Sequence, residues 1–577
     1  MLQRMILFLF LFLFCLSVQA GFHAAQFPQT ADGNLLAWVV FKDKGGQNTA
    51  LYKPGELLRQ RAIDRRLLRR PNRPLVDYSD LPVYPPYLDE VRSRVQKIRV
   101  VSRWLNAVSV EATAQSLEDL QALDFVLKVD PVRQAKPIDK EKIEVRPETL
   151  APKIQAEIDT LFYGYSFNQL DLIGVPFLHE KGLHGEGVVI GMLDDGVNLL
   201  NYHVAFDSLN VLATRDFIHG DDDVTDSEFK AFEGWHGTMT LSTIAGYVPT
   251  RLIGPAYRAQ FLLAKTEVDQ SETPVEEDYW VAGIEWLEQN GADIVSSSLG
   301  YIDWYSPADM DGETAKTTIA ADLAVEKGVI VFNSAGNEGD NPDVNTLIAP
   351  ADGKKVLAIA AVDRFGLRAS FSSVGPTADG RIKPDLAAMG LYVYVASKSH
   401  ADQFVYASGT SFSCPLAAGG AALLLQAYPQ TTPELMARAL KETASQAAFP
   451  DKFLGWGVIN LEKAYYFLDT TSVVYPPMQG EHLAVYPARP NPASEIVKIP
   501  FQVTYPSFVE VRLFDIRGRK VLSFGTKFRG ANRIHYETLQ GDDLKNLASG
   551  VYVYLVLSRE LGTGAIFRKS GKLVVLH

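Results

Sequence analysis

Residues 181–466 alternate between two kinds of apolar segment, and this alternation limits the possible folds of the chain more than any other feature. Short runs rich in β-branched residues indicate buried strands, and longer segments with helical spacing lie between them. The strand-like runs include residues 188–193, 294–298, 329–333 and 356–362, and the helical segments include residues 281–289, 315–326 and 416–427. Strands separated by helices predict an α/β domain with a parallel sheet and helices on both of its faces.

The length of 577 residues predicts about three folded units. Apolar residues form 47% of the chain and charged residues 21%, which are ordinary values for a water-soluble globular protein. This composition excludes a disordered chain, a collagen-like fibre and a multi-span membrane protein. Two cysteines in the whole chain also exclude a scaffold held by disulfides.

Residues 1–20 have the pattern of a secretory signal peptide. A basic residue precedes the uncharged, mostly apolar residues 5–18, and small residues up to Ala20 supply a cleavage signal. We expect this segment to be cleaved; a retained membrane anchor is the alternative, although the run is short for a helix that crosses a bilayer. Cleavage would remove Cys15 and leave Cys414 alone, so the mature chain could form no internal disulfide. A secreted protein of this size without disulfides suggests a bacterial source.

Charge divides the chain into three blocks. Residues 21–150 carry a net charge of +4, residues 151–470 carry −23 and residues 471–577 carry +6, within a total of −12. The negative total disfavours a nucleic-acid binder. One interpretation is that the three blocks are separate surfaces, each adjusted for solubility. The other is that the basic first block docks on the acidic middle block, because opposite potentials favour association.

Smaller units flank the α/β region. Residues 26–135 predict a small α+β unit, with strands at 35–41, 97–101 and 125–129 and a short helix at 117–123. Residues 136–165 are rich in Lys, Glu and Pro and predict an exposed, cleavable connector. After a proline-rich linker over residues 470–490, the apolar period changes to two, as at Val509, Val511 and Leu513, with further strands at 551–557 and 573–576. This pattern predicts a small β-sandwich.

Four motifs of the middle block place polar side chains at the ends of strands or helices. Asp194 ends an apolar strand, so we expect it at the carboxyl edge of the sheet, where open α/β sheets build their sites. His236 opens a helix and is followed by small residues that allow close approach. Ser411 follows a glycine turn at a helix N-terminus, where backbone N–H groups are exposed. Asn337 directly follows a buried strand, and its amide group can donate to a negative oxygen.

Together these side chains supply the parts of one mechanism. A serine hydroxyl is a weak nucleophile unless a base takes its proton, and an imidazole base needs a carboxylate that fixes its tautomer. The oxyanion that forms needs a donor placed in advance. Singly, each residue has a commoner explanation: a carboxylate that binds a metal or backbone, a surface or helix-capping histidine, an N-cap serine and a turn asparagine. Their occurrence together in one domain favours the catalytic interpretation.

The order Asp, His, Ser and the local motifs resemble those of the subtilisin-like serine proteases. The matching segments are Leu193-Asp194-Asp195-Gly196, His236-Gly237-Thr238, Ser334-Ala335-Gly336-Asn337 and Gly409-Thr410-Ser411-Phe412-Ser413-Cys414-Pro415, within roughly residues 165–466. The resemblance implies a subtilisin-like fold. It also implies that Asp194 orients the base, His236 acts as general base and then acid, Ser411 attacks, and Asn337 donates to the oxyanion.

Two residues depart from the family pattern. Asp195 stands where Thr or Ser is usual, although the kexin-like branch also has two aspartates there, and Met239 replaces the usual His or Ser after the histidine motif. Neither change argues against activity. Cys414, three residues after Ser411, could be mistaken for a nucleophile; we expect it to be buried and inert.

By the same resemblance, Ser298-Leu299-Gly300 forms an edge strand that pairs with the substrate backbone, and Ser334-Ala335-Gly336 helps to wall the pocket for the residue before the scissile bond. No charge lies in either segment, which favours a pocket for apolar or bulky side chains over one for arginine. We expect no cofactor and no catalytic metal, and the sequence assigns no structural calcium site. The acidic run Asp221-Asp222-Asp223 is interpreted as a solvated loop rather than a site for Ca²⁺ or basic substrate residues.

The flanking units resemble two known domain types. The segment from Ser102 to Glu111, within residues 26–135, resembles the inhibitory propeptides of bacterial subtilisin-like enzymes, with a permanent accessory domain as the alternative. The tail resembles C-terminal sorting domains of the type IX secretion pathway through Pro490-Asn491-Pro492-Ala493, Asp515-Ile516-Arg517-Gly518-Arg519 and Ala548-Ser549-Gly550-Val551-Tyr552. A substrate-binding or stabilising sandwich is the alternative for the tail.

The sequence therefore predicts a secreted serine endopeptidase, made as a self-processing zymogen. Its predicted parts are a signal peptide (1–20), a propeptide with connector (21–150), a catalytic domain (165–468) and a sorting domain (485–577). We expect a monomer at or beyond the cell surface whose partners are protein or peptide substrates, its own propeptide and the secretion machinery. One rival is a catalytically inactive scaffold or adhesin. Another is an esterase, although the Gly-x-Ser-x-Gly turn expected there is absent around Ser411.

Overall fold

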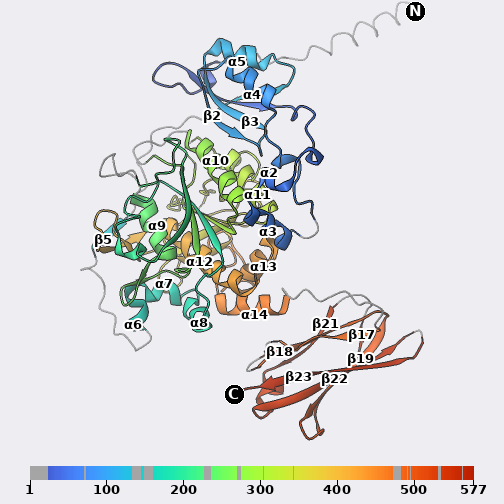
Figure 1. Ribbon diagram of the computed structural model, residues 1–577. Coiled ribbons are helices and arrows are strands. Elements are labelled where there is room, and N and C mark those ends of the chain that lie inside the picture. The colour runs from blue at the N-terminus through green and yellow to red at the C-terminus, as the bar shows by residue number, and fades with distance from the viewer. Residues whose placement is uncertain are drawn as a thin grey trace, which may run out of the picture.

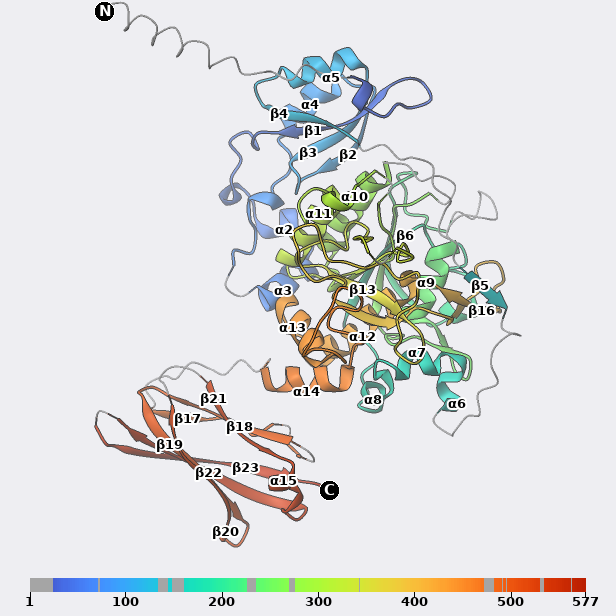
Figure 2. The same ribbon diagram turned by 180° about the vertical axis from the view of Figure 1, so that it is seen from behind.

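The computed structural model contains a small N-terminal unit, a central α/β domain and a C-terminal pair of sheets (Figures 1 and 2). It describes residues 24–577 except for 71–72, 133–143, 148–159, 226–234, 269–274, 303, 342, 472–481, 490, 494–495, 530–533 and 562. The expected signal peptide, including Cys15, lies outside the described residues.

The N-terminal unit is a four-stranded antiparallel sheet with helices packed against it, which confirms the predicted α+β class. The strands are β1 (Leu35–Phe41), β2 (Lys97–Ser102), β3 (Ala107–Ala112) and β4 (Val126–Pro131), in the order β2-β3-β1-β4. The helices are α2 (Pro54–Leu57), α3 (Gln60–Arg69), α4 (Pro85–Arg92) and α5 (Ala114–Gln121). The helix α5 begins three residues earlier than predicted because the Thr113 side chain accepts from the backbone N–H of Ser116 and caps it.

The central domain is built on a seven-stranded parallel sheet, counted over the described residues, in the order β14-β13-β12-β11-β6-β10-β7. Its strands are β6 (Val189–Asp194), β7 (Asn210–Asp216), β10 (Gln260–Lys265), β11 (Ile294–Ser297), β12 (Ile330–Ser334), β13 (Leu357–Val362) and β14 (Leu386–Met389). Every residue of β6 is buried, as expected of a strand covered on both faces. The predicted fold class is therefore confirmed.

Helices cover both faces of this sheet. On one face, α9 (Trp235–Ala245) and α12 (Thr410–Ala427) form a core with Ile190 and Met192 of β6. On the other face, α10 (Val275–Asn290) and α11 (Lys316–Glu326) pack with Val189 and Leu193. The remaining elements are α6 (Thr160–Tyr163), α7 (Phe167–Asp171), α8 (Val175–Glu180), α13 (Pro433–Thr443), α14 (Leu461–Thr471), β8 (Tyr247–Val248), β9 (Leu252–Ile253), β15 (Val393–Ala396) and β16 (Phe404–Ser408).

Two described parts of the predicted connector form regular secondary structure. Within it, β5 (Glu144–Pro147) pairs antiparallel with β16, with Glu144 opposite Ser408. At its end, the Tyr163 side chain is buried in the same core as the central sheet, two residues before the start predicted for the catalytic domain. The pattern of β5 could not be recognised because the strand is four residues long and its partner lies more than 250 residues away.

The C-terminal unit consists of two antiparallel sheets around one core, as predicted for a β-sandwich. One sheet has the order β17-β18-β21 and the other β20-β19-β22-β23. The elements are β17 (Leu483–Val485), β18 (Ile496–Val503), β19 (Ser507–Asp515), β20 (Lys520–Arg529), β21 (Ile534–Gln540), α15 (Asp542–Lys545), β22 (Gly550–Glu560) and β23 (Ile566–Val575). Val497 and Ile499 of the first sheet share this core with Val511 and Tyr554 of the second.

The N-terminal unit contacts the central domain through carboxylates of α10. Asp278 accepts from Trp38 Nε1 (2.5 Å) and forms an ion pair with Arg99 (2.9 Å). Glu285 accepts from Ser102 Oγ (2.5 Å) and from the backbone of Trp104 (3.3 Å). The Trp104 side chain packs among core residues of the central domain beneath α10.

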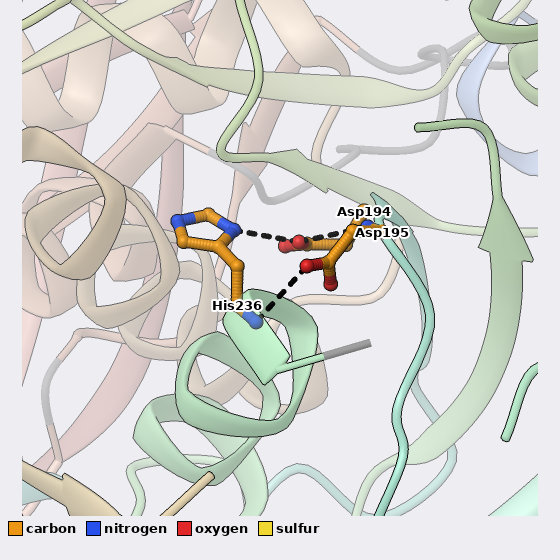
Figure 3. A group of neighbouring side chains, drawn as sticks. All are labelled: Asp194, Asp195 and His236. Carbon is orange, nitrogen blue, oxygen red and sulfur yellow. Dashed lines mark hydrogen bonds and ion pairs between the residues drawn. The ribbon is translucent and has the colours of Figure 1, made fainter. Parts of the chain in front are cut away.

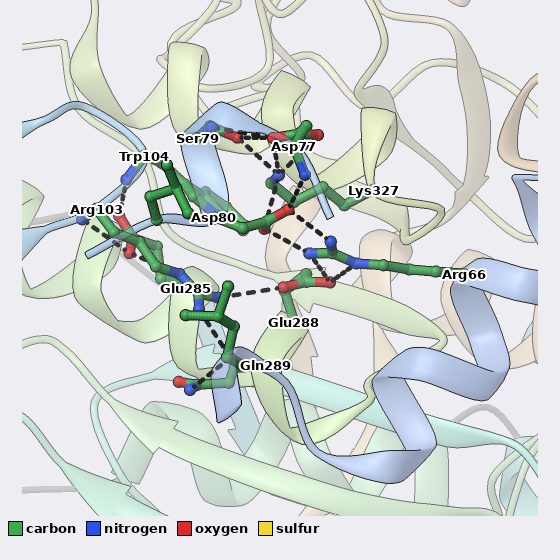
Figure 4. A network of polar contacts seen from close by, with 12 residues as sticks. Arg66, Asp77, Ser79, Asp80, Arg103, Trp104, Glu285, Glu288, Gln289 and Lys327 are labelled. Atoms are coloured by element: carbon green, nitrogen blue, oxygen red, sulfur yellow. Dashed lines mark hydrogen bonds and ion pairs between the residues drawn. The ribbon is translucent and has the colours of Figure 1, made fainter. Parts of the chain in front are cut away.

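The helix α3 adds a second set of contacts around Glu288, the last carboxylate of α10 (Figure 4). Glu288 is fully buried and accepts from Arg65, from Arg66 Nε (2.9 Å) and from Arg103 (3.4 Å). Burial acts to raise the pKa of Glu288, but the surrounding guanidinium groups hold it below its ordinary value. These contacts support the interpretation in which the basic first block docks on the acidic middle block.

Candidate active site

Asp194 and His236 meet at the carboxyl edge of the sheet (Figure 3). Asp194 is the last residue of β6, and His236 is the second residue of α9. The His236 Nδ1 atom lies 2.6 Å from Asp194 Oδ1, and Thr240 Oγ1 donates to Asp194 Oδ2 at 2.8 Å. Both oxygens of Asp194 therefore have donors, and the carboxylate is fixed facing the imidazole. The structure thus brings together Asp194 and His236, two of the predicted site residues.

Asp195 caps the helix that carries His236. Its Oδ2 accepts from the backbone N–H of His236 (3.0 Å), and its Oδ1 accepts from that of Gly237 (2.7 Å). The first N–H groups of a helix have no partner within the helix, so a carboxylate here stabilises the N-terminus of α9. Gly237 is required because a Cβ at this position would lie 1.9 Å from the carbonyl oxygen of Gly196.

Asp194, Asp195 and His236 are also close enough to one another to be considered as metal ligands. Their contacts argue for a different role. The carboxylate oxygens of both aspartates accept from protein donors, and the Nδ1 atom of His236 is directed at a carboxylate. This arrangement suits an imidazole held for proton transfer.

Ser411 is the second residue of α12 and is almost fully buried. Its Oγ lies 3.4 Å from the carbonyl oxygen of Ser298, and Ser298 Oγ donates to the Ser411 carbonyl at 2.8 Å. The second contact has a clear reason: Pro415, four residues further on, has no N–H for the Ser411 carbonyl, and the hydroxyl of Ser298 replaces that donor. The His236 ring is near the next residue, with its centroid 6.3 Å from that of Phe412.

Asn337 is tied to the residue before Ser411. Its Oδ1 accepts from the backbone N–H of Thr410 (2.8 Å) and from Thr410 Oγ1 (2.9 Å). Thr410 Oγ1 also accepts from the N–H of Gly336 at 3.2 Å. With its oxygen held on this side, the carboxamide directs its NH₂ group to the other side.

Cys414 is fully buried, as predicted. Burial raises the pKa of its thiol to about 12, so the group is neutral at ordinary pH. Its Sγ lies 3.5 Å from the carbonyl oxygen of Ser297 and 3.7 Å from Ser296 Oγ. It packs between α12 and β11 as a small apolar residue.

The two expected substrate segments follow neighbouring parallel strands. Residues 298–300 follow β11, and residues 335–337 follow β12, which pairs with β11 in the sheet. Residues 298–300 were expected to form an edge strand, but they are not part of any strand in the structure. A strand is assigned from hydrogen bonds to a neighbouring strand. Tyr301, the next residue, forms a bridge with Ala349. Asp221-Asp222-Asp223, the acidic run, is exposed.

Sequence reasoning missed three supporting residues. Thr240 orients Asp194, Asp195 caps α9, and Thr410 orients Asn337. Thr240 lies one helical turn after His236, so it shares a helix face with that histidine and could have been found from the spacing alone. The role of Asp195 depends on the approach of two segments that are 41 residues apart, which no local pattern contains.

Comparisons with known proteins identify the family of the central domain. The model of the subtilase family matches residues 185–457, a range that includes Asp194, His236, Asn337 and Ser411. Subtilisin DY of Bacillus licheniformis is 31% identical over 299 residues, which cover 51% of this chain and 97% of that protein. The chain belongs to the subtilase family. It is a subtilisin-like serine peptidase.

Other relatives cover similar parts of this subtilase. Subtilisin E of Bacillus subtilis (strain 168) is 30% identical over 51% of this chain and 69% of its own length. The thermostable alkaline protease of Halalkalibacterium halodurans is 28% identical over 61% of this chain and 89% of its own. Among solved structures, a protease of Pseudoalteromonas arctica PAMC 21717 matches with a TM-score of 0.43 and 24% identity, over 54% of this chain and all of that chain.

The flanking units of the subtilase also match known domains. A peptidase S8 propeptide domain of Bacteroidota matches residues 36–147, and a secretion system C-terminal sorting domain matches residues 484–564. The subtilase therefore has a propeptide and is secreted through its C-terminal domain, which confirms both resemblances. In the part of the chain that the structure describes, no helix is long and apolar enough to span a bilayer.

Proposed function

We propose that the subtilase is an endopeptidase that hydrolyses peptide bonds through an acyl-enzyme on Ser411. The observation that carries this proposal is the contact of 2.6 Å between Asp194 and His236, at the same edge of the sheet as the start of α12. The Nδ1 atom faces the carboxylate, so Nε2 is the nitrogen that takes the hydroxyl proton. The Asp194 carboxylate stabilises the imidazolium that results.

The reaction then has two stages. Ser411 Oγ attacks the carbonyl carbon of the peptide, its proton passes to His236, and the carbonyl oxygen becomes an oxyanion. The carbon–nitrogen bond breaks as His236 returns the proton to the amine, which leaves an ester on Ser411. Water hydrolyses the ester by the same steps in reverse order. The Asn337 amide donates to the oxyanion, and its fixed carboxamide avoids reorganisation when that charge forms.

Residues Ser298, Leu299 and Gly300 are proposed to bind the substrate backbone as an added strand, opposite Ser334, Ala335 and Gly336. The position of Ser298 supports this proposal, because its carbonyl oxygen lies 3.4 Å from Ser411 Oγ and the segment therefore begins beside the nucleophile. The proposed boundaries are 1–20 for the signal peptide, 21–150 for the propeptide and connector, 165–468 for the catalytic domain and 485–577 for the sorting domain. The buried Tyr163 packs in the core of that catalytic domain. We further propose a monomer that needs no cofactor.

Labelling with a serine-reactive phosphonate tests the nucleophile directly. We expect one equivalent of phosphonate label on the self-processed protein, located at Ser411 by peptide mass spectrometry. A thiol reagent should leave Cys414 unlabelled at neutral pH, because burial raises the pKa of its thiol to about 12. No label would favour the inactive scaffold. Comparing peptide with ester substrates of equal side chains then separates a peptidase from an esterase.

Asp195 is expected to act through the helix that it caps. We expect Asp195→Ala to lower the free energy of unfolding by about 1–2 kcal/mol, the usual effect of losing an N-cap, and to lower kcat roughly tenfold because His236 is less well held. Asp195→Asn keeps an oxygen acceptor and should stay within about threefold of the wild type. Urea unfolding and peptide hydrolysis measure both effects. Equal losses in the two variants would assign the effect to charge instead of capping.

A further inference from the structure

Ile348 is a buried side chain that belongs to neither main core. The Ile348 side chain is only 5% exposed. Among the described residues, however, it belongs to neither of the two hydrophobic cores that cover the faces of the sheet. Its backbone N–H donates to the carbonyl of Ala335 (3.3 Å), and the next residue, Ala349, bridges to Tyr301. The chain at Ile348 therefore runs between the segments that follow β11 and β12.

Two glycines face this isoleucine, one on each segment. A Cβ built on Gly300 would lie 2.1 Å from Ile348 Cδ1 and 2.4 Å from Cγ1, and one built on Gly336 would lie 2.9 Å from Cγ2. Carbon atoms in contact are normally about 3.5–4.0 Å apart. Both segments thus approach the Ile348 side chain as closely as glycine allows, and the isoleucine fills the space between them.

The same two segments are fixed to the start of α12. The Ser298 carbonyl lies 3.4 Å from Ser411 Oγ, and Asn337 Oδ1 accepts a hydrogen bond from the backbone N–H of Thr410. In the proposed reaction, the carbonyl carbon of the substrate lies at Ser411 and the oxyanion at Asn337. The side chain of the residue that carries this carbonyl then enters between the two segments and meets Ile348.

We propose that Ile348 makes the enzyme selective for substrates with a small, uncharged residue before the scissile bond. The inference rests on the proposed function and names its substrate class. Interiors are packed nearly as densely as crystals, so a large side chain cannot share this space with a branched isoleucine without strain. Residues 298–300, residues 334–336 and Ile348 carry no charge that could pair with an arginine or a glutamate. We therefore expect alanine or serine to fit better than phenylalanine, whereas the sequence alone favoured apolar or bulky side chains.

The test compares peptides that differ only in that residue, with alanine, leucine, phenylalanine or arginine. The self-processed full-length protein is expected to cleave the alanine peptide with a kcat/KM on the order of 100-fold above that of the phenylalanine peptide. Ile348→Ala should raise kcat/KM for the phenylalanine peptide at least tenfold and change the alanine peptide by less than about threefold. Ile348→Val removes the methyl group nearest Gly300 and should change the ratio of kcat/KM between the phenylalanine and alanine peptides in the same direction. This smaller change serves as the test if the alanine variant does not fold.

Ile330→Ala is the matched control, since Ile330 begins β12 at the opposite edge of the sheet and is equally buried. It should leave the ratio of the two peptides unchanged. Equal cleavage of the phenylalanine and alanine peptides by the wild type, or a ratio that neither Ile348 variant moves, would overturn the inference alone. Failure of the wild type to cleave any of the peptides would instead contradict the proposed function, and the inference with it.

Discussion

Replacing Ser411 by alanine is expected to lower kcat for a peptide substrate by about a million-fold, the loss that removal of the nucleophile causes in subtilisin. The remaining rate reflects binding and oxyanion stabilisation, which do not need the hydroxyl. The same change should leave the precursor whole. The intact mass of the signal-less protein, measured after incubation at neutral pH, should show a cut within residues 137–165 for the wild type and none for the variant.

Ser413→Ala is the control for this experiment. Ser413 lies two residues further along α12, is fully buried and donates only to the Thr410 carbonyl among the described contacts of its hydroxyl (2.9 Å). We expect it to process itself and to hydrolyse peptides within about threefold of the wild type, since one ordinary hydrogen bond contributes about 1 kcal/mol to stability. A Ser411→Ala protein that is cut as fast as the wild type, after purification from a host without this enzyme, would exclude Ser411 as the nucleophile.

The positions of Asp194, His236, Asn337 and Ser411 could be predicted because each lies where a local pattern ends. A strand buried on both faces is a continuous apolar run, so its last residue is visible in the sequence, as at Asp194. A glycine turn before a helix marks the N-terminus that carries Ser411. The predicted strand 188–193 and the observed β6 differ by one residue, which matters little because the carboxylate leaves the sheet at the same edge.

What the sequence could not show depends on segments that meet only in the fold. Nothing near Ile348 indicates that two glycines from other segments will surround it. The proposed effect of Ile348 on substrate choice depends on contacts between segments that are distant in the sequence. The absence of charge in residues 298–300, in contrast, can be read directly from the sequence. The strand β5 is a further case, because its backbone hydrogen bonds are made with a distant strand and its four residues have no apolar alternation of their own.

The contact between propeptide and catalytic domain was one of two interpretations that the charge pattern left open, and the pattern could not locate it. Net charges of +4 and −23 indicate attraction between two blocks, without naming the atoms that meet. The structure concentrates the attraction at the end of α10, where Glu288 receives three guanidinium groups. Asp293, before β11, adds ion pairs with Arg61 (2.5 Å) and Arg69 (3.1 Å) of α3. Both carboxylates belong to the catalytic domain, and α3 lies within the propeptide match.

This arrangement predicts that cutting the connector does not by itself release the propeptide. The Glu288 side chain and those of Arg65 and Arg66 are at most 1% exposed, so water and salt reach them poorly while the two parts stay together. The ion pairs of Glu288 join α10 to residues 65, 66 and 103, and none of these residues belongs to the connector. We therefore expect the severed propeptide to remain bound and to dissociate slowly, with activity appearing only as it leaves.

Glu288→Gln should greatly accelerate that release. The change leaves the buried Arg65 without the carboxylate of Glu288 and removes one of two carboxylates from Arg66, which keeps its ion pair with Asp80. Breaking one partner of a buried charge pair at an interface costs about 2–5 kcal/mol, or roughly 30-fold to several thousand-fold in dissociation. Size-exclusion chromatography of the cut protein, followed over time beside peptide hydrolysis, measures the release and the activity together. Glu326→Gln is the control, because its ion pair with Lys355 is partly exposed and contributes little. If the Glu288 variant keeps its propeptide as long as the wild type does, the four-stranded sheet of the propeptide and Trp104 hold it without help from α3. If the variant loses the propeptide early and becomes active sooner, the arginine contacts of α3 determine how long the zymogen stays inhibited.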